Sequence, residues 1–328
     1  MEIKSSLNNQ PSHTNWDYWI GHFEICRMDH WIKNIFVLPG VLVALEFAPL
    51  STISVALVAR LLLGLLAIGF IASSNYVINE ICDAPFDLMH PKKRFRPVPS
   101  GRVKIPLAYF QWIALMAIGL MLASWISWPF TIVLGALWIM GFFYNIRPFR
   151  TKDIPYFDVL SESVNNPLRM LAGWYIVNPS YFPSTNLLLS YWMIGSYLMA
   201  LKRFAEFRDI ADHQIAASYR KSFRFYNEDR LLVSVMFYAS ASMLFLGAFI
   251  MHYKIELILA FPLLAWVMAI YMHLAFKKDS AVQAPEKLYR EPLLMTSVIL
   301  CTSVMIGLLF IRIPQLAAFF PPTMSVNP

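Results

Sequence analysis

Residues 52–79, TISVALVARLLLGLLAIGFIASSNYVIN, decide the fold, and EICDAPFD follows them at 80–87. The first stretch is almost entirely apolar and exceeds the roughly 20 residues needed to cross about 30 Å of hydrocarbon. Asn79, Asp83 and Asp87 follow one another at intervals of four. On a helix this spacing places the three side chains on one face. The sequence therefore predicts a membrane-spanning helix that ends in carboxylate and amide groups.

The composition supports a membrane protein throughout. Apolar residues make up 58% of the 328 residues and charged residues 14%, against about 45–50% and about 25% in soluble domains. The three cysteines lie far apart, which argues against a disulfide framework or a cysteine metal site. We therefore predict an all-α, polytopic membrane protein with nine transmembrane helices. The expected spans are 32–48, 52–79, 105–124, 127–144, 155–178, 186–207, 231–251, 255–276 and 292–312.

Basic residues alternate from one connection to the next. Of the 27 Lys and Arg residues, 23 fall in the N-terminal segment or in even-to-odd connections, and the other connections are almost bare. The positive-inside rule then predicts a cytoplasmic N-terminus. The basic excess follows from topology, so we expect no nucleic-acid partner. We expect a cytoplasmic segment at 1–30, a single transmembrane domain at 31–313 and a short tail at 314–328.

The end of the second span has the residue types of a magnesium and phosphate site. Carboxylate and amide oxygens are ligands that Mg²⁺ prefers, and it usually needs only one or two carboxylates beside a substrate phosphate. Bases that suit a diphosphate follow at once; they are Lys93, Arg94 and Arg96. The simpler alternative is that the acids only neutralise a basic loop. Because proline disrupts a helix, Pro85 predicts a kink or stop near Ala84, which would place Asp87 on a loop.

The fifth span carries a polar stripe at helical spacing. Its members are Asp158, Glu162, Asn165 or Asn166, and Arg169. Ionisable residues at membrane depth are unfavourable and usually face a cavity or a partner. Pro167 interrupts the same stretch and favours a broken helix. An internal Glu162–Arg169 ion pair that only joins helices is the alternative.

Further charges lie where other spans begin or end. We expect the sixth span to contribute Lys202, Arg203 and Glu206, either to a pocket shared with the second span or as an ordinary basic cap. Lys33 at the start of the first span is either a topology anchor or a phosphate contact. Arg60 is expected to pair with Glu46. Anion-binding groups precede the fifth span, and these are Tyr144, Arg147, Arg150 and Lys152.

The run Asn79, Asp83, Asp87, followed by HPKKRFRPVPSG at 90–101, resembles the first signature of the UbiA superfamily of intramembrane prenyltransferases. WIKN at 31–34 and KRFAE at 202–206 are similar to its decaprenyl-phosphate phosphoribosyltransferase branch. The resemblance implies a UbiA-like helical bundle in a bacterial inner membrane, a site facing the cytoplasm and a role in cell-envelope biosynthesis.

This chain departs from the family pattern at several positions. Glu80 stands where the family has its first Asp, and the resemblance implies that it remains an oxygen ligand of the metal. Leu88 replaces a frequent Arg. The second Asp-x-x-x-Asp motif is not found in that form, and the sixth span offers Glu206, Asp209 and Asp212 instead.

These residues favour loss of pyrophosphate from carbon, assisted by Mg²⁺. We expect Asn79, Asp83 and Asp87 to be catalytic, and the excess of cations to bind a donor and an acceptor that both carry phosphate. The favoured reaction moves 5-phosphoribose from 5-phosphoribosyl 1-diphosphate to a polyprenyl phosphate. The alternative moves a polyprenyl group from its diphosphate to an aromatic or glycerol-phosphate acceptor. An anion transporter is a third possibility, which the one-sided charge distribution disfavours.

Overall fold

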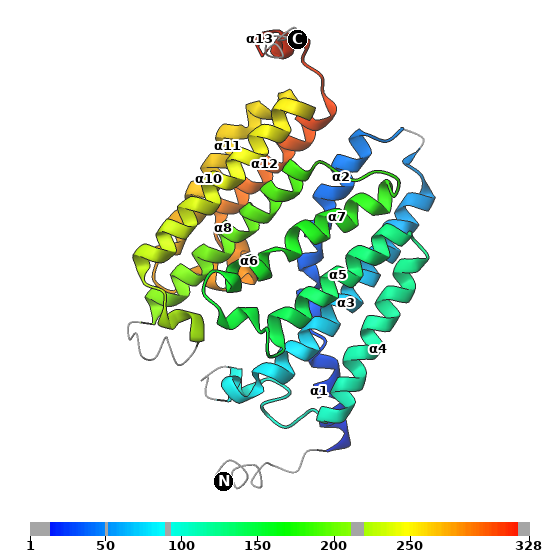
Figure 1. The fold of residues 1–328 in the computed structure, drawn as a ribbon, viewed down its shortest axis with the longest axis vertical. Coiled ribbons are helices and arrows are strands. Elements are labelled where there is room, and N and C mark those ends of the chain that lie inside the picture. The colour runs from blue at the N-terminus through cyan, green and yellow to red at the C-terminus, as the bar shows by residue number, and fades with distance from the viewer. Residues whose placement is uncertain (1–13, 50–51, 89–92, 211–219, 321–328) are drawn as a thin grey trace. The chain divides into compact units, whose positions relative to one another are not determined.

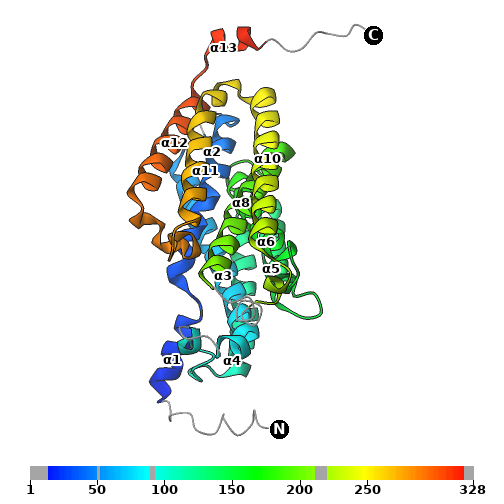
Figure 2. The ribbon, with the colours of Figure 1, turned by 90° about the vertical axis from the view of Figure 1, so that its left-hand side faces the viewer.

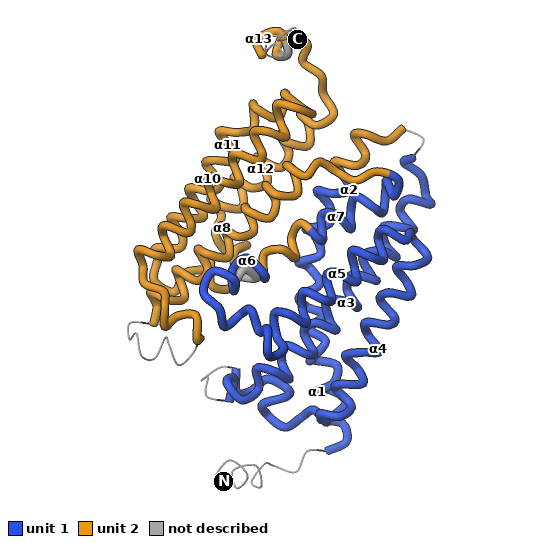
Figure 3. Tube along the Cα trace, viewed as in Figure 1, with its two compact units in different colours: residues 1–41, 50–161, 168–180 blue, residues 42–49, 162–167, 181–328 orange. Residues whose placement is uncertain are grey.

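The structure, a computed structural model, describes residues 14–49, 52–88, 93–210 and 220–320. Every regular element in these ranges is a helix, so the predicted all-α class is confirmed for the described chain. The chain divides into two compact units (Figure 3). The first comprises residues 1–41, 50–161 and 168–180, and the second comprises 42–49, 162–167 and 181–328.

Three long helices form the body of the first unit: α3 (Val55–Asp87), α4 (Ile105–Ser124) and α5 (Trp128–Asn145). They pack against one another and are seen side by side in Figure 1. The short helix α1 (Asn15–Glu24), which the sequence had not predicted, precedes a 3₁₀ helix at Met28–Val37.

Polar side chains join the three long helices at membrane depth. The Ser74 hydroxyl on α3 donates to the carbonyl oxygen of Trp112 on α4 at 2.7 Å. It accepts from the indole of Trp138 on α5 at 3.1 Å. The Asn75 amide donates to the Leu137 carbonyl oxygen at 3.0 Å. Because no water is available in hydrocarbon, these internal partners hold α3 in a fixed rotation against α4 and α5.

The second unit is built from α8 (Thr185–Asp209), α10 (Glu228–Tyr253), α11 (Phe261–Ala275) and α12 (Pro292–Phe310). Helix α8 packs against α10 and α11, and α11 packs against α12 (Figure 2). The Tyr197 hydroxyl on α8 donates to the Met268 carbonyl oxygen on α11 at 2.6 Å. The short helix α13 (Pro314–Phe319) follows α12.

Glu46 has a different partner from the one predicted. It ends α2 (Leu38–Glu46), and its carboxylate pairs with the Lys254 ammonium at 2.9 Å. The expected pairing with Arg60 is therefore wrong. Lys254 comes from the turn that follows α10, so the ion pair depends on how the chain folds and not on the order of the spans.

Seven helical segments of the described residues are long and apolar enough to cross a membrane. The predicted stretch 155–178 is not among them because it forms two shorter helices. Helix α8 is long enough but more polar. Nine spans and a cytoplasmic N-terminus thus remain predictions. The seven segments are Asn15–Glu46, Val55–Asp87, Ile105–Ser124, Trp128–Asn145, Glu228–Tyr253, Ile255–Ala275 and Pro292–Phe310.

The interruption predicted within 155–178 is confirmed. A single residue separates helix α6 (Phe157–Ser163) from helix α7 (Asn165–Val177). Pro167 lies in the first turn of α7, where its missing amide hydrogen has no intrahelical partner to lose. Gly173 of α7 lies against the chain at Val37, where an added Cβ would be 2.1 Å from the carbonyl oxygen. This position therefore requires glycine.

The predicted stop near Ala84 is wrong. Helix α3 continues through Pro85 and includes Asp87 as its last residue. The amide of Leu88 still donates to the Ala84 carbonyl oxygen at 3.1 Å. The proline removes one hydrogen bond in the final turn but does not end it. Asn79, Asp83 and Asp87 consequently belong to one continuous helix.

Candidate active site

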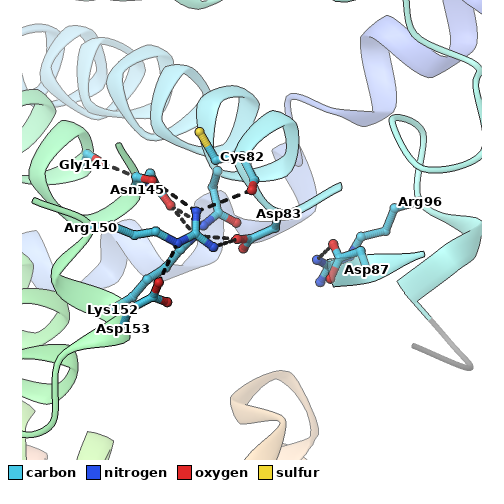
Figure 4. A network of polar contacts seen from close by, with 10 residues as sticks. Cys82, Asp83, Asp87, Arg96, Gly141, Asn145, Arg150, Lys152 and Asp153 are labelled. Atoms are coloured by element: carbon cyan, nitrogen blue, oxygen red, sulfur yellow. Dashed lines mark hydrogen bonds and ion pairs between the residues drawn. The ribbon is translucent and has the colours of Figure 1, made fainter. Parts of the chain in front are cut away.

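The Asp83 carboxylate accepts two cations on a single oxygen. Its Oδ1 lies 2.6 Å from the Lys152 ammonium and 2.9 Å from Nη2 of Arg150 (Figure 4). Lys152 and Arg150 are buried, whereas 23% of the Asp83 side chain is exposed. Asp153 supplies a second carboxylate through its pair with Arg150, so the two cations are balanced in number, but both bind the same Asp83 oxygen. We call Asn79, Asp83, Asn145, Arg150, Lys152 and Asp153 the Asp83 cluster.

Asn145, the last residue of α5, joins the metal-ligand candidates to the cations. Its Oδ1 accepts from Nδ2 of Asn79 at 2.6 Å and from the Lys152 ammonium at 2.8 Å. Its own Nδ2 donates to the Gly141 carbonyl oxygen at 2.8 Å. Asn145 is not among the residues predicted from the sequence, although its place at the end of an apolar span beside Tyr144 would have indicated it.

Arg150 is held by several groups of the first unit. Its Nε pairs with Asp153 at 3.1 Å, and its Nη1 donates to the carbonyl oxygens of Asn145 at 3.2 Å and Cys82 at 3.4 Å. Its guanidinium lies over the Phe86 ring at 5.1 Å. Arg150 has a φ of 27°, which turns the chain back after α5. The turn brings a loop arginine to the end of α3.

Lys152 follows in the 3₁₀ turn at Thr151–Asp153. Its ammonium lies 5.6 Å from the centre of the Tyr144 ring, so the structure brings the predicted pair together. Burial lowers the pKa of Lys152, and the neighbouring Asp83 carboxylate opposes this effect. Burial thus disfavours the charged ammonium, whereas the nearby carboxylate favours it.

Asp87 and Glu80 have separate partners. Asp87 accepts from Nη1 of Arg96 at 2.6 Å, one helical turn beyond Asp83. Both oxygens of Glu80 are engaged elsewhere, one by Arg27 and one by the backbone amide of Val98, each at 3.0 Å. Because Glu80 is also only 1% exposed, its geometry does not support the expected role as a metal ligand. It joins the N-terminal segment to the loop after α3.

The charges of the sixth span form their own cluster in the second unit. The Arg203 guanidinium is 1% exposed and pairs with Glu162 at 2.8 Å and with Glu206 at 3.1 Å. Arg203 is thus a partner of Glu162 that the sequence did not predict, and the alternative pairing of Glu162 with Arg169 stays a prediction. Two carboxylates therefore surround one guanidinium here, whereas in the Asp83 cluster two cations share one carboxylate oxygen.

The remaining candidates from the sequence differ in how far they are buried. Asp158 is fully buried in the first turn of α6, and Arg169 is partly buried in α7. Lys33, Lys93 and Lys202 are partly exposed, whereas Arg94 and Arg147 are exposed. His90, Pro91, Lys92 and Asp212 fall outside the described residues.

The oxygen donors of α3 suit a hard cation. Among the described residues no group of three or more His, Cys, Asp or Glu side chains is arranged for a metal. Mg²⁺ does not require such a group, because it commonly takes one or two carboxylates and completes its shell with substrate phosphate and water. Asn79, Asp83 and Asp87 offer oxygen donors of this kind on one helix, and Arg150 and Lys152 are bound to Asp83 beside them.

Comparison with known proteins gives one family. The model described as the UbiA prenyltransferase family matches residues 37–311. The chain is 29% identical over 232 residues to a decaprenyl-phosphate phosphoribosyltransferase of Corynebacterium glutamicum, covering 68% of this chain and 64% of that protein. It is 26% identical over 187 residues to the uncharacterized protein y4nM of Sinorhizobium fredii, covering 56% of this chain and 33% of the relative. The aligned parts thus span about a third to just under two thirds of these relatives.

A solved structure shares the fold. It is that of a UbiA homolog from Archaeoglobus fulgidus bound to DMAPP and Mg²⁺, with a TM-score of 0.67 and 20% identity. The match covers 88% of this chain and 97% of that one. At this identity the likeness concerns the arrangement of helices alone.

Proposed function

The chain belongs to the UbiA prenyltransferase family, and from this premise we propose that it transfers 5-phosphoribose from 5-phosphoribosyl 1-diphosphate to a polyprenyl phosphate and releases pyrophosphate. The observation that carries the proposal is the Asp83 cluster, in which Lys152 and Arg150 share one carboxylate oxygen. Buried cations beside oxygen ligands fit a diphosphate accompanied by a divalent metal. The similarity to decaprenyl-phosphate phosphoribosyltransferases supports this donor.

In this proposal Asn79, Asp83 and Asp87 hold Mg²⁺. When bound, the ion neutralises charge that develops on the leaving pyrophosphate. Lys152 and Arg150 bind diphosphate oxygens, and the Asn145 and Asp153 contacts keep their side chains in place. In this proposal helix α3 supplies the metal ligands of the donor site, and the turn after α5 supplies its cations.

The proposed transfer of phosphoribose needs no strong base. The bond between ribose C1 and the diphosphate oxygen breaks, and its electron pair leaves with pyrophosphate. An oxygen of the lipid phosphate forms the new bond to C1. That oxygen is already anionic at neutral pH, so the residues of the site need only position the reactants and stabilise negative charge.

Purified full-length protein in detergent tests the reaction. Mg²⁺ and 5-phosphoribosyl 1-diphosphate are supplied with and without polyprenyl phosphate, and pyrophosphate is measured. We expect release that depends on the lipid, together with a lipid-linked phosphoribose identified by mass. No lipid-linked product, in a preparation that remains folded, would contradict the proposal.

A second function is favoured by other relatives. The chain is 26% identical over 134 residues to a digeranylgeranylglyceryl phosphate synthase of Sulfurisphaera tokodaii, covering 40% of this chain and 45% of that protein. The same cluster would then bind a polyprenyl diphosphate. Turnover of that donor with a glycerol-phosphate or aromatic acceptor, and none of the phosphoribosyl donor, would establish this alternative.

A further inference from the structure

The side chain of Asn145 has an orientation that its neighbours determine. An ammonium can only donate hydrogen bonds, so the Asn145 atom 2.8 Å from Nζ of Lys152 is its oxygen. The other atom, Nδ2, then donates to the Gly141 carbonyl oxygen, which can only accept. Both contacts require the same orientation of the amide (Figure 4).

The orientation of the Asn145 amide determines that of the Asn79 amide. Since Oδ1 of Asn145 is an acceptor, the Asn79 atom 2.6 Å from it is Nδ2. The oxygen of Asn79 is therefore the atom directed away from Asn145. An amide can ligate a hard cation only through its oxygen. The Gly141 carbonyl oxygen thus determines, through Asn145, which end of Asn79 is available.

The same oxygen of Asn145 also places the cation. Lys152 has a flexible side chain, and its ammonium lies between Oδ1 of Asn145 and Oδ1 of Asp83 at 2.8 and 2.6 Å. Asn145 is only 3% exposed and lies at the end of a rigid helix. One buried group thereby sets the positions of a metal-ligand candidate and of an anion-binding candidate.

We propose that Asn145 is a positioning residue, which presents the oxygen of Asn79 to the metal and holds Lys152 beside Asp83. This inference rests on the proposed function only in that the Asp83 cluster binds a divalent metal with a diphosphate. It holds for either donor. Groups that orient metal ligands typically change metal affinity by about 10–100-fold when they are removed.

Metal binding tests the role without turnover. Full-length protein in detergent is titrated with Mn²⁺ in the presence of pyrophosphate, and free Mn²⁺ is measured by its electron paramagnetic resonance signal. Asn145→Leu has a similar volume but no acceptor, so we expect an affinity at least about tenfold weaker. Asn145→Asp keeps an acceptor for both Asn79 and Lys152 but loses the donor to the Gly141 carbonyl oxygen, so we expect its affinity to lie between those of the natural protein and Asn145→Leu.

Asn75 provides the matched control. It lies one turn before Asn79 on α3 and also donates to α5, at the Leu137 carbonyl oxygen. Asn75→Leu removes a hydrogen bond between the same two helices without changing Asn79 or Lys152, so we expect no change in Mn²⁺ affinity. If Asn145→Leu does not fold, Asn145→Ser, which is too short to reach both donors, replaces it with the same expectation.

The outcomes separate the two proposals. Equal Mn²⁺ affinity for the natural protein and Asn145→Leu overturns the positioning role and leaves the proposed function intact. Equal losses in Asn145→Leu and Asn75→Leu also overturn it, because the effect then reflects helix packing. If the natural protein does not bind Mn²⁺ with pyrophosphate, the metal site of the proposed function fails and the inference fails with it.

Discussion

Two groups of buried charges in this protein pair in different ways. In the Asp83 cluster of the first unit, two cations share one carboxylate oxygen. In the second unit Glu46 pairs with Lys254 at 2.9 Å, and Glu256 accepts from the backbone amide of Ile313 at 3.0 Å. Glu256 also interacts electrostatically with Lys254 and Arg312, and these residues border a pocket of about 330 Å³.

The difference shows that burial of charge does not by itself identify an active site. The Glu46–Lys254 pair joins the end of α2 to the turn after α10. In the Asp83 cluster, by contrast, one carboxylate oxygen that two cations share can exchange these partners for a metal when an anion binds the cations. The sharing of one oxygen, and not the number of charges, therefore distinguishes the candidate active site from a structural contact.

Asp83→Asn is expected to have the largest effect on turnover. The amide is isosteric, but it removes the negative charge that Lys152 and Arg150 share and weakens metal binding. We expect turnover to fall by at least about 100-fold in protein that still folds, as measured by pyrophosphate release. Activity within about threefold of the natural protein would remove Asp83 from the site.

Lys152→Gln should have the next largest effect. Glutamine keeps a donor but loses the charge that binds diphosphate, so we expect kcat/KM for the donor to fall by about 10–100-fold. Steady-state kinetics over a range of donor concentrations measures this loss. An unchanged kcat/KM would mean that Lys152 serves only to neutralise Asp83.

Glu80→Gln separates structural from metal-binding carboxylates on α3. It removes the charged partner of Arg27 while an amide oxygen remains for Val98. We expect a clearly lower melting temperature, since breaking a buried ion pair destabilises by about 3–5 kcal/mol. The Mn²⁺ affinity should stay the same. A tenfold weaker affinity at an unchanged melting temperature would restore Glu80 as a ligand.

Lys254→Met should leave turnover per folded molecule unchanged. The uncompensated Glu46 carboxylate destabilises the protein by about 3–5 kcal/mol, and adding Glu46→Gln should recover much of the loss. Thermal unfolding in detergent compares the single and double variants. A drop in turnover equal to that of Lys152→Gln would erase the distinction between the two groups.

The local features of the fold could be predicted from the sequence. The long apolar run and the spacing of Asn79, Asp83 and Asp87 gave one helix face, and Pro167 correctly marked an interruption. The helix stop expected near Pro85 is wrong, because a proline in a final turn removes a single hydrogen bond. Periodicity predicts which helices form but not whether a helix continues past a proline near its end.

Partners far apart in the chain could not be predicted in this way. Arg150 reaches Asp83 because its left-handed φ turns the chain back, and no periodic pattern encodes such a turn. Glu80 has the residue type of a metal ligand but is engaged by Arg27, 53 positions earlier. Asn145 was missed because its role depends on two donors from different segments.

Lipid-dependent pyrophosphate release most directly tests whether the Asp83 cluster is the donor site. It is measured for the natural protein, Asp83→Asn and Lys254→Met at equal concentrations of folded molecules. The donor is 5-phosphoribosyl 1-diphosphate with Mg²⁺ and polyprenyl phosphate. We expect release by the natural protein and by Lys254→Met at the same rate, and almost none by Asp83→Asn. Equal release by all three proteins, or none by the natural protein, would contradict the assignment of the Asp83 cluster as the donor site.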